Sequence, residues 1–554
     1  MWIFVSLFLN TELAFSATIH VNSVSALQAA VNNAVPGDSI ILNDGKYTTN
    51  GNINVTSRGT STKPIVISAQ TIGGVEIAGG GGFTISSPAT YIVIKGFIFT
   101  HKTGISKIAS GATHCLITRN VFECAAVNSG DKSYLTVSGD DNEVSYNTFQ
   151  NKTDEGKMLS IQGPGSDKMA KRTWIHHNYF YNFPPTANNC SAIQIGLSGR
   201  SMDSAFSVVE YNLFIKTRGE NEGGICNKSC KNIYRYNTFG DGCEELSLRH
   251  GNFCEVYGNF FMGSTGLRFS GDDHKIYSNF FSGCPDAIDC TNGDGEVAEG
   301  SALTCHDRPD RVLIVYNTII DCTSSFQEPG RTNGLGATNI TFANNIIQGG
   351  GAVSIRGSYT DPVWAGNILW NTTAGSMPAS GYTLNDPMLA TDASGVYHIQ
   401  PGSPAIGAGE GSFPFVMLDI DGQSRGSAPD AGADQLAHTP VSNRVLTVAD
   451  VGPKAGIPVA TSKETFHSAA NEFRVFPNPV IGRTKIYYSI QEASWVKLSL
   501  LNASGISSLS LVNCRKEAGN YESVIDVSPL PRGYYWVCLT TEQSAKSAGI
   551  YVIK

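Results

Sequence analysis

The chain has 554 residues, of which 59 are glycine and 41% are hydrophobic, and its formal net charge is −8. This length exceeds that of one small domain, and the apolar content is sufficient for a packed core with many turns. The negative charge gives no support for nucleic-acid binding, and beyond the N-terminus no segment holds the roughly 18 consecutive apolar residues of a membrane-spanning helix.

The N-terminus has the pattern of an export signal. Residues 2–9 are apolar, and Ala14-Phe15-Ser16 has the small-x-small form of a cleavage site, although the segment contains no Lys or Arg. We therefore expect residues 1–16 to be a signal peptide and the protein to be secreted or exposed at the cell surface. A helix is expected next, within residues 24–35, where it would cap an exposed strand edge.

A short phrase in which Asn precedes apolar or Thr-apolar residues recurs through most of the chain. From Asn237 to Asn259 to Asn279 the steps are 22 and 20 residues, which leaves no room for a helix between strands. A period of this length predicts an all-β solenoid of stacked coils, running from about residue 17 to residue 371. Asn residues stacked at bends form amide ladders that satisfy backbone groups, and we assign this role to Asn147, Asn178, Asn237, Asn259 and Asn279.

The pattern changes after the solenoid. A loop-rich segment rich in Gly, Pro and Asp continues to about residue 434, and residues 435–470 are mostly small, polar or charged. From residue 472 short alternating strands return, which is typical of a small β-sandwich. We therefore expect a solenoid domain at residues 17–440, a linker at 441–470 and a C-terminal sandwich at 471–554.

Three cationic residues occur at similar places in consecutive repeats. Lys228, Arg249 and Arg268 precede their repeat Asn by 9, 10 and 11 residues. Because residues one period apart in a solenoid lie about 4.8 Å apart, we expect these side chains to stack on one face as an active site.

Two carboxylates lie shortly before Lys228. Glu220 and Glu222 would repel each other in one groove unless a cation joins them. Oxygen ligands of this kind suit Ca²⁺, and the amide of Asn188 or Asn189 in the preceding coil would supply a third ligand. The alternative is a pair of turn carboxylates exposed to solvent.

These residue types fit one reaction on an acidic polysaccharide. Positive charge beside an ammonium group disfavours its charged form, so a lysine can act as a base, while an arginine stays charged and stabilises a developing oxyanion. With a cation on the substrate carboxylate, the set fits removal of the C5 proton of a uronate and expulsion of the C4 oxygen. Glycoside hydrolysis instead needs a carboxylate pair, such as Asp272 with Asp273 or Asp241 with Glu244, and would leave the cations unexplained.

At these positions the chain resembles polysaccharide lyase family 6, which contains alginate lyases and chondroitinase B. The matched phrases are Asn227-Lys228-Ser229, Leu248-Arg249-His250-Gly251-Asn252, Gly266-Leu267-Arg268 and Gly271-Asp272-Asp273-His274. The resemblance covers residues 18–435 and implies a right-handed parallel β-helix.

The resemblance also implies roles for individual residues. Lys228 is expected to be the base and Arg249 the acid or charge stabiliser. Substrate-binding roles fall on His250, Arg268 and His274, and calcium-ligand roles on Asn188, Glu220 and Glu222. The chain departs from the family pattern at Gly223-Gly224, which lengthens the spacing to Lys228, and at Cys190–Gln194, where Glu and Arg are common.

The C-terminal part resembles the type A sorting domain of the Bacteroidetes type IX secretion system. The matched motifs are Phe476-Pro477-Asn478-Pro479, Leu530-Pro531-Arg532-Gly533-Tyr534-Tyr535 and Tyr551-Val552-Ile553-Lys554. This resemblance implies export across the outer membrane through that machinery. A carbohydrate-binding sandwich is the alternative.

Together these patterns predict an exported lyase that cleaves alginate by a calcium-assisted Lys/Arg mechanism. Chondroitin or dermatan sulfate is an alternative substrate, and a pectate-lyase-like enzyme would use the same chemistry. A non-catalytic glycan-binding solenoid is the alternative from another functional class.

Overall fold

The computed structural model describes residues 16–102, 104–125, 132–184, 190–219, 223–298, 301–437, 439–456, 473–476, 480, 482–490, 492–502, 507–531, 533–541 and 545–552. The chain divides into two compact units, Met1–Ile457 and Pro458–Lys554. Of the expected signal peptide, only Ser16 falls in these ranges.

The first unit begins with the expected helical cap. Helix α1 (Val24–Asn32) starts at Ser23, whose hydroxyl accepts a hydrogen bond from the Ala26 N–H. Leu27 and Val31 are its buried residues, and the helix contacts the first strands of the solenoid. An apolar stripe of this kind closes the end of the core.

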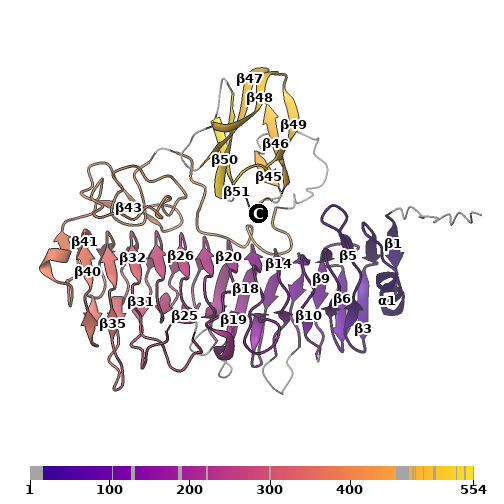
Figure 1. Cartoon of the computed structure of the whole chain (residues 1–554), viewed down its shortest axis with the longest axis horizontal. Coiled ribbons are helices and arrows are strands. Elements are labelled where there is room, and N and C mark those ends of the chain that lie inside the picture. Colours follow the sequence, from indigo (N-terminus) through magenta and orange to yellow (C-terminus); the bar gives the residue numbers. More distant parts are fainter. Residues whose placement is uncertain are drawn as a thin grey trace, which may run out of the picture. The chain divides into compact units, whose positions relative to one another are not determined.

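Three long parallel sheets run through the first unit, as Figure 1 shows. Sheet A consists, in spatial order, of β1 (Thr18–Val21), β2 (Ser39–Leu42), β5 (Ile65–Ala69), β8 (Ile92–Lys95), β11 (Leu116–Thr118), β14 (Glu143–Ser145), β17 (Trp174–His176), β20 (Val208–Glu210), β23 (Ile233–Arg235), β26 (Glu255–Tyr257), β29 (Lys275–Tyr277), β32 (Leu313–Val315), β36 (Thr341–Ala343) and β40 (Val363–Ala365). Sheet B consists of β3 (Gly45–Thr49), β6 (Val75–Gly79), β9 (Phe97–Phe99), β12 (Val121–Phe122), β15 (Thr148–Gln150), β18 (Tyr179–Phe183), β21 (Leu213–Thr217), β24 (Thr238–Phe239), β27 (Phe260–Met262), β30 (Phe280–Ser282), β33 (Thr318–Ile320), β37 (Ile346–Gln348), β41 (Asn367–Trp370) and β42 (Tyr382–Leu384).

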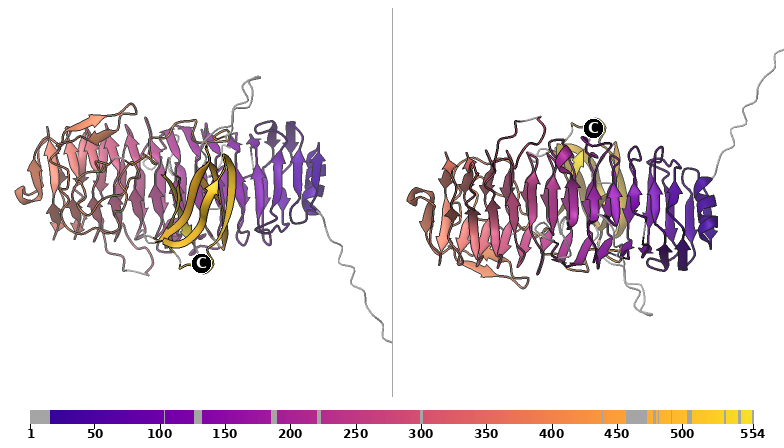
Figure 2. Two further views of the ribbon diagram at one scale, coloured as in Figure 1. Left: turned by 90° about the horizontal axis from the view of Figure 1, so that it is seen from above. Right: turned by 90° about the horizontal axis from the view of Figure 1, so that it is seen from below.

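Sheet C is the sheet that carries the candidate site. Its strands are β4 (Ile53–Val55), β7 (Phe83–Ile85), β10 (Ser106–Ile108), β13 (Leu135–Val137), β16 (Lys157–Ile161), β19 (Ser191–Gly196), β22 (Ile225–Lys228), β25 (Leu246–His250), β28 (Leu267–Phe269), β31 (Asp286–Cys290), β34 (Ser324–Glu328) and β38 (Ser354–Ile355). Each coil contributes one strand to each sheet, and Figure 2 shows strands of successive coils side by side along the solenoid. This is the predicted right-handed parallel β-helix.

The repeat Asn residues form a continuous ladder between sheets A and B. Asn237, for example, accepts hydrogen bonds through its Oδ1 from the backbone N–H and the side-chain amide of Asn212, and its own amide donates to Asn259. The same pattern links Asn120, Asn147, Asn178, Asn212, Asn237, Asn259, Asn279, Asn317, Asn345 and Asn367. The predicted amide ladder is confirmed.

The residue before each ladder Asn explains the recurring Tyr-Asn phrase. Tyr146, Tyr211, Tyr236 and Tyr316 all have left-handed backbone with φ of 52–56°, which the Asn hydrogen bonds on the next residue hold in place. Gly258 takes this position in its coil with φ of 64°, as expected for the residue that adopts it without strain.

A stack of phenylalanine rings fills the centre of the solenoid. Consecutive ring centroids are 4.6–5.0 Å apart, one strand spacing, and the rings are buried. The series is Phe99, Phe122, Phe149, Phe180, Phe214, Phe239, Phe261 and Phe281.

The segment after the solenoid covers sheet B. It contains η2 (Ala379–Gly381) and the hairpin of β43 (Leu389–Thr391) and β44 (Tyr397–Ile399), and its apolar side chains pack on sheet B residues such as Phe260 and Phe280. The remaining short elements of the unit are η1 (Ser198–Arg200) and the pair β35 (Ala337–Thr338) and β39 (Tyr359–Thr360).

Residues 441–456 belong to this covering segment, although the sequence pattern had placed them in a linker. Leu446 and Val451 pack against Leu213, and the Leu446 N–H donates to the Thr238 hydroxyl. Arg119 donates to the carbonyl oxygens of Pro453 and Ala455. The first unit therefore extends to about residue 457.

The second unit consists of two antiparallel sheets. One contains β45 (Arg474–Phe476), β46 (Arg483–Ile490) and β49 (Gly519–Asp526), and the other contains β48 (Ser507–Lys516), β47 (Ser494–Asn502), β50 (Gly533–Thr540) and β51 (Ala545–Val552). Residues such as Val496, Leu498 and Val537 form its own apolar core. In the described part of the chain, no helix has the length and apolar character needed to cross a membrane.

Candidate active site

The predicted cationic residues lie on neighbouring strands β22, β25 and β28 of sheet C, but not in one column. Lys228 pairs with His250, because the register shifts after Asn227 and makes Arg249 the extra residue of a β-bulge. Arg268 pairs with Ser247, two residues before Arg249. The expected stack of three cations in register is therefore wrong, and the unequal offsets of 9, 10 and 11 residues from the ladder Asn were the sign of this shift.

The bulge instead gathers Lys228, Arg249 and His250. The side chain of Lys228 is largely buried, with 9% of the residue exposed. Within the described ranges, none of the side chains or carbonyl groups accepts a hydrogen bond from its ammonium group. Arg249 is half-buried beside it on the next strand.

His250 lies at the centre of this positive charge. Burial, followed by the charges of Arg249, His306, Lys228 and Arg268, lowers the pKa of His250 to about 3. The imidazole is therefore neutral near neutral pH. Its Nδ1 is buried and has no hydrogen-bond partner among the described groups.

His306 reaches this group from the loop after β31. Its ring centroid is 5.4 Å from that of His250, and its backbone N–H donates to the Asp294 carboxylate at 2.8 Å. Burial and the nearby Arg249 lower the pKa of His306. Arg331, from the next coil, pairs with Asp294, so one carboxylate holds both the His306 main chain and a further cation next to the cluster.

Arg268 lies at the edge of the cluster between two acidic groups. Its guanidinium is 3.4 Å from the Glu245 carboxylate and its side chain is 30% exposed. Asp289 pairs with Arg268 on strand β31, and burial raises the pKa of Asp289 to about 6 despite this cation. Arg268 is thus held in place while part of it still faces solvent.

His274 is not part of this surface. The residue is fully buried, its Nδ1 accepts a hydrogen bond from the Cys254 N–H, and its Nε2 donates to the Ser270 carbonyl. Burial lowers the pKa of His274 to about 4. The substrate-binding role expected for His274 is therefore wrong, because both ring nitrogens serve the backbone inside the solenoid.

The expected calcium ligands Asn188, Glu220 and Glu222 lie outside the described residues. The described residues on either side of these expected ligands lie close to one another. The main chain at Gly219 passes so close to the Cys190 carbonyl that an added Cβ would lie 2.3 Å from it, and the Ala192 N–H donates to the Gly223 carbonyl. The described residues that flank the expected ligands therefore lead into adjacent strands β19 and β22 of sheet C.

Sequence reasoning missed His306, Arg331 and Asp294. They lie in long connections without repeat phrases, so no period assigned them to a face of the solenoid. The length of the 284–311 insertion was the available signal, because long loops in solenoids often border the functional face.

The geometry defines the class of protein as a parallel β-helix with a basic cluster on the outer face of one sheet. The family model described as chondroitinase B matches residues 21–346, which is more than half of the chain. The chain therefore belongs to the chondroitinase B family, which is a family of polysaccharide lyases. No curated protein sequence matches the chain.

Solved structures of related fold agree. Alginate lyase AlyGC of polysaccharide lyase family 6 is 24% identical with a TM-score of 0.61, over 70% of this chain and 56% of AlyGC. A mannuronic-acid-specific family 6 lyase from human gut microbiota is 25% identical with a TM-score of 0.56, over 66% of this chain and 90% of that one. A family 6 alginate lyase in complex with a trisaccharide is 19% identical with a TM-score of 0.58, over 79% and 95% of the two chains. This chain thus spans little more than half the length of AlyGC.

The second unit has a match of its own. A secretion system C-terminal sorting domain matches residues 474–554. This domain indicates that the protein is exported by the type IX system and is secreted or held at the cell surface.

Proposed function

We propose that this protein is an exported lyase that cleaves alginate by β-elimination. The observation that carries the proposal is the β-bulge, which gathers Lys228, Arg249 and neutral His250 on the outer face of sheet C. The substrates named for the related family 6 structures favour alginate over other uronates. We also propose that residues 1–16 are a signal peptide removed on export.

Each residue of the cluster has a chemical role in this proposal. The Nζ of Lys228 takes the C5 proton of the uronate, the C5–H electrons form the C4–C5 double bond, and the C4–O bond breaks. Arg249 stabilises the charge that develops and supplies the proton for the leaving oxygen. His250 and Arg268 bind the uronate, and a neutral His250 offers either a donor or an acceptor there.

Calcium is part of the proposal. The donor set of two carboxylates and an amide supplies the hard oxygen ligands that Ca²⁺ binds, and Asn188, Glu220 and Glu222 would hold it. When bound, Ca²⁺ would neutralise the uronate carboxylate and make the C5 proton more acidic.

The test is product formation by the purified chain. Alginate, chondroitin sulfate, dermatan sulfate and polygalacturonate are incubated with it, and the ultraviolet absorbance of the unsaturated uronate is followed. We expect product from alginate, and a loss of about 10²–10⁴-fold in Lys228→Ala. Lys231→Ala, which removes an exposed lysine from the next turn, is the matched control and should keep full activity.

The other outcomes decide between the alternatives. Product only from the sulfated glycans would replace alginate by chondroitin or dermatan sulfate. Binding of alginate without product, unchanged in Lys228→Ala, would replace the enzyme by a glycan-binding solenoid. Activity that survives a chelator, in the native chain and in Glu222→Gln alike, would remove calcium from the mechanism.

A further inference from the structure

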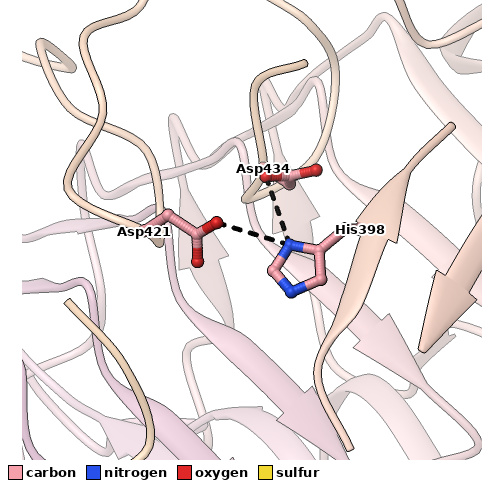
Figure 3. A group of neighbouring side chains, drawn as sticks. All are labelled: His398, Asp421 and Asp434. Atoms are coloured by element: carbon pink, nitrogen blue, oxygen red, sulfur yellow. Dashed lines mark ion pairs between the residues drawn. The ribbon is translucent and has the colours of Figure 1, made fainter. Parts of the chain in front are cut away.

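A second group of chemically reactive side chains lies in the segment that covers sheet B, away from the basic cluster on sheet C. His398 on strand β44 faces two carboxylates from separate loops, Asp421 and Asp434, as Figure 3 shows. One ligand atom from each of the three residues lies within 4.8 Å of the others. The lyase chemistry proposed above does not use any of them.

The two His398 distances in this group fit ligands of one metal ion and are long for charge-assisted hydrogen bonds. The Nδ1 of His398 is 3.5 Å from Asp421 Oδ2 and also 3.5 Å from Asp434 Oδ1. A charge-assisted N–H···O bond is about 2.7–2.9 Å long, and a single proton on Nδ1 cannot point at both oxygens. Two ligands held about 2.1 Å from a tetrahedral zinc ion are separated by about 3.4 Å.

The two carboxylates are also buried next to His398, and Asp421 has less hydrogen-bond support than Asp434. Asp421 is 7% exposed and Asp434 is 5% exposed. In the described part of the chain, the Asp421 carboxylate accepts no hydrogen bond, although it is directed at His398 (Figure 3). Because burial of an ionised carboxylate without a donor is costly, a cation between these groups would offset that cost.

Asp392 and the Ile399 backbone lie next to the three residues. The second ring nitrogen of His398, Nε2, lies 3.5 Å from the Asp392 carboxylate. The other oxygen of Asp434 accepts a hydrogen bond of 2.7 Å from the Ile399 N–H. A histidine that binds a metal commonly donates its second N–H to a carboxylate, and this fixes both the tautomer and the ring orientation.

We propose that His398 Nδ1, Asp421 and Asp434 bind one Zn²⁺ ion, which clips the β43–β44 hairpin to the two loops that follow it. Imidazole and carboxylate ligands suit zinc, whereas calcium prefers oxygen ligands alone. The side chain of His398 is 24% exposed, so water completes the coordination shell. The site is independent of the calcium ligands proposed for sheet C.

The experiment uses the full purified chain, stripped of metals and then kept in excess Ca²⁺ so that any calcium site is filled. Zn²⁺ is added, unbound metal is removed, and zinc is measured by mass spectrometry. We expect one equivalent of bound zinc and a higher melting temperature. Substitution of Co²⁺ for zinc should give weak visible bands without thiolate charge-transfer absorption, which separates this site from the cysteines.

Variants decide whether the named residues hold the ion. Asp421→Asn and Asp434→Asn should each lose the bound equivalent, while Asp392→Asn should weaken binding by about 10–100-fold. Asp430→Asn is the matched control, because Asp430 is equally buried in this segment but bonds the Gly407 and Leu436 N–H groups instead. No uptake by the native chain, or equal uptake by Asp421→Asn, Asp434→Asn and the native chain, would overturn the proposal.

Discussion

His250 and His274 are both buried histidines of the solenoid, but only His250 faces the outer side of sheet C. His250 has an unpartnered Nδ1 beside Lys228 and Arg249, whereas both nitrogens of His274 bond the backbone. Replacing His274 by Ala leaves two buried backbone groups without partners, which costs about 3 kcal/mol. His250→Ala removes no such bond.

We therefore predict opposite effects for these two variants. His274→Ala should lower the free energy of unfolding and leave the turnover of the folded protein unchanged at low temperature. His250→Ala should reduce turnover by about 10-fold or more with little change in unfolding, since His250 lines the proposed substrate site. Denaturant unfolding and initial rates on alginate, measured on both variants, check this. A large loss of turnover in His274→Ala under conditions where the variant is fully folded would contradict this prediction.

Glu328 is a buried carboxyl whose charge opposes folding. Burial raises the pKa of Glu328 to about 7, although the Gly357 N–H partly offsets this. In the unfolded chain this carboxyl group loses its proton near pH 4. Between about pH 4 and pH 7 the folded state therefore holds a proton that the unfolded state has released. Stability is then lost as the pH rises from about 4 to 7, by no more than about 3 kcal/mol.

Glu328→Gln should remove this pH dependence. We expect the variant and the native chain to be equally stable at about pH 4, and the variant to be more stable at about pH 8. Urea unfolding of both proteins at the two pH values measures the difference. If the variant and the native chain differ in stability by the same amount at both pH values, Glu328 does not titrate between them.

At the scale of single elements, the Asn ladder is the feature that holds the coils in register. Asn237 accepts from the Asn212 N–H and side chain and donates to the Val209 carbonyl, the Arg235 carbonyl and Asn259. Asn237→Ala should therefore lower the free energy of unfolding by about 3–5 kcal/mol, because several buried groups lose their partners together.

Asn182→Gly is the control for this prediction. Asn182, in strand β18, also has left-handed backbone, with φ of 55°, but among the described residues its partly buried side chain donates to Asn151 alone. Glycine tolerates this conformation, so the loss should be about 1 kcal/mol or less. Equal losses in the two variants would mean that the ladder adds no more than an ordinary bend.

The sequence predicted this ladder because each Asn recurs beside a Phe or Ile that must face the core. The solenoid followed from the repeat period, the α1 cap from a helical pattern at the exposed solenoid end, and the C-terminal sandwich from short alternating strands. The register of the cationic residues did not follow, because a β-bulge at Arg249 moves one strand by one residue without changing composition. His306 could not be placed either, since its position next to His250 depends on the path of a loop that lies outside the repeat.

At the scale of the molecule, each unit has its own apolar core. The sandwich core contains Val496, Leu498 and Val537, and the solenoid core ends within the first unit. A chain of residues 17–457 should therefore fold and keep the melting temperature and activity of the first unit. Loss of the sandwich should instead prevent export, because the sorting domain is the part that matches a secretion signal.

A chain that ends at residue 440 should behave differently. It lacks Leu446 and Val451, which pack against Leu213, and the carbonyl groups that accept from Arg119. Their apolar burial alone contributes about 3–6 kcal/mol, so this shorter chain should unfold at a lower temperature and expose sheet B. Calorimetry of the two truncated chains makes the comparison, with Leu446→Ala in the longer one as an intermediate. If both chains melt together, residues 441–456 act only as a linker and the boundary predicted from the sequence pattern is the correct one.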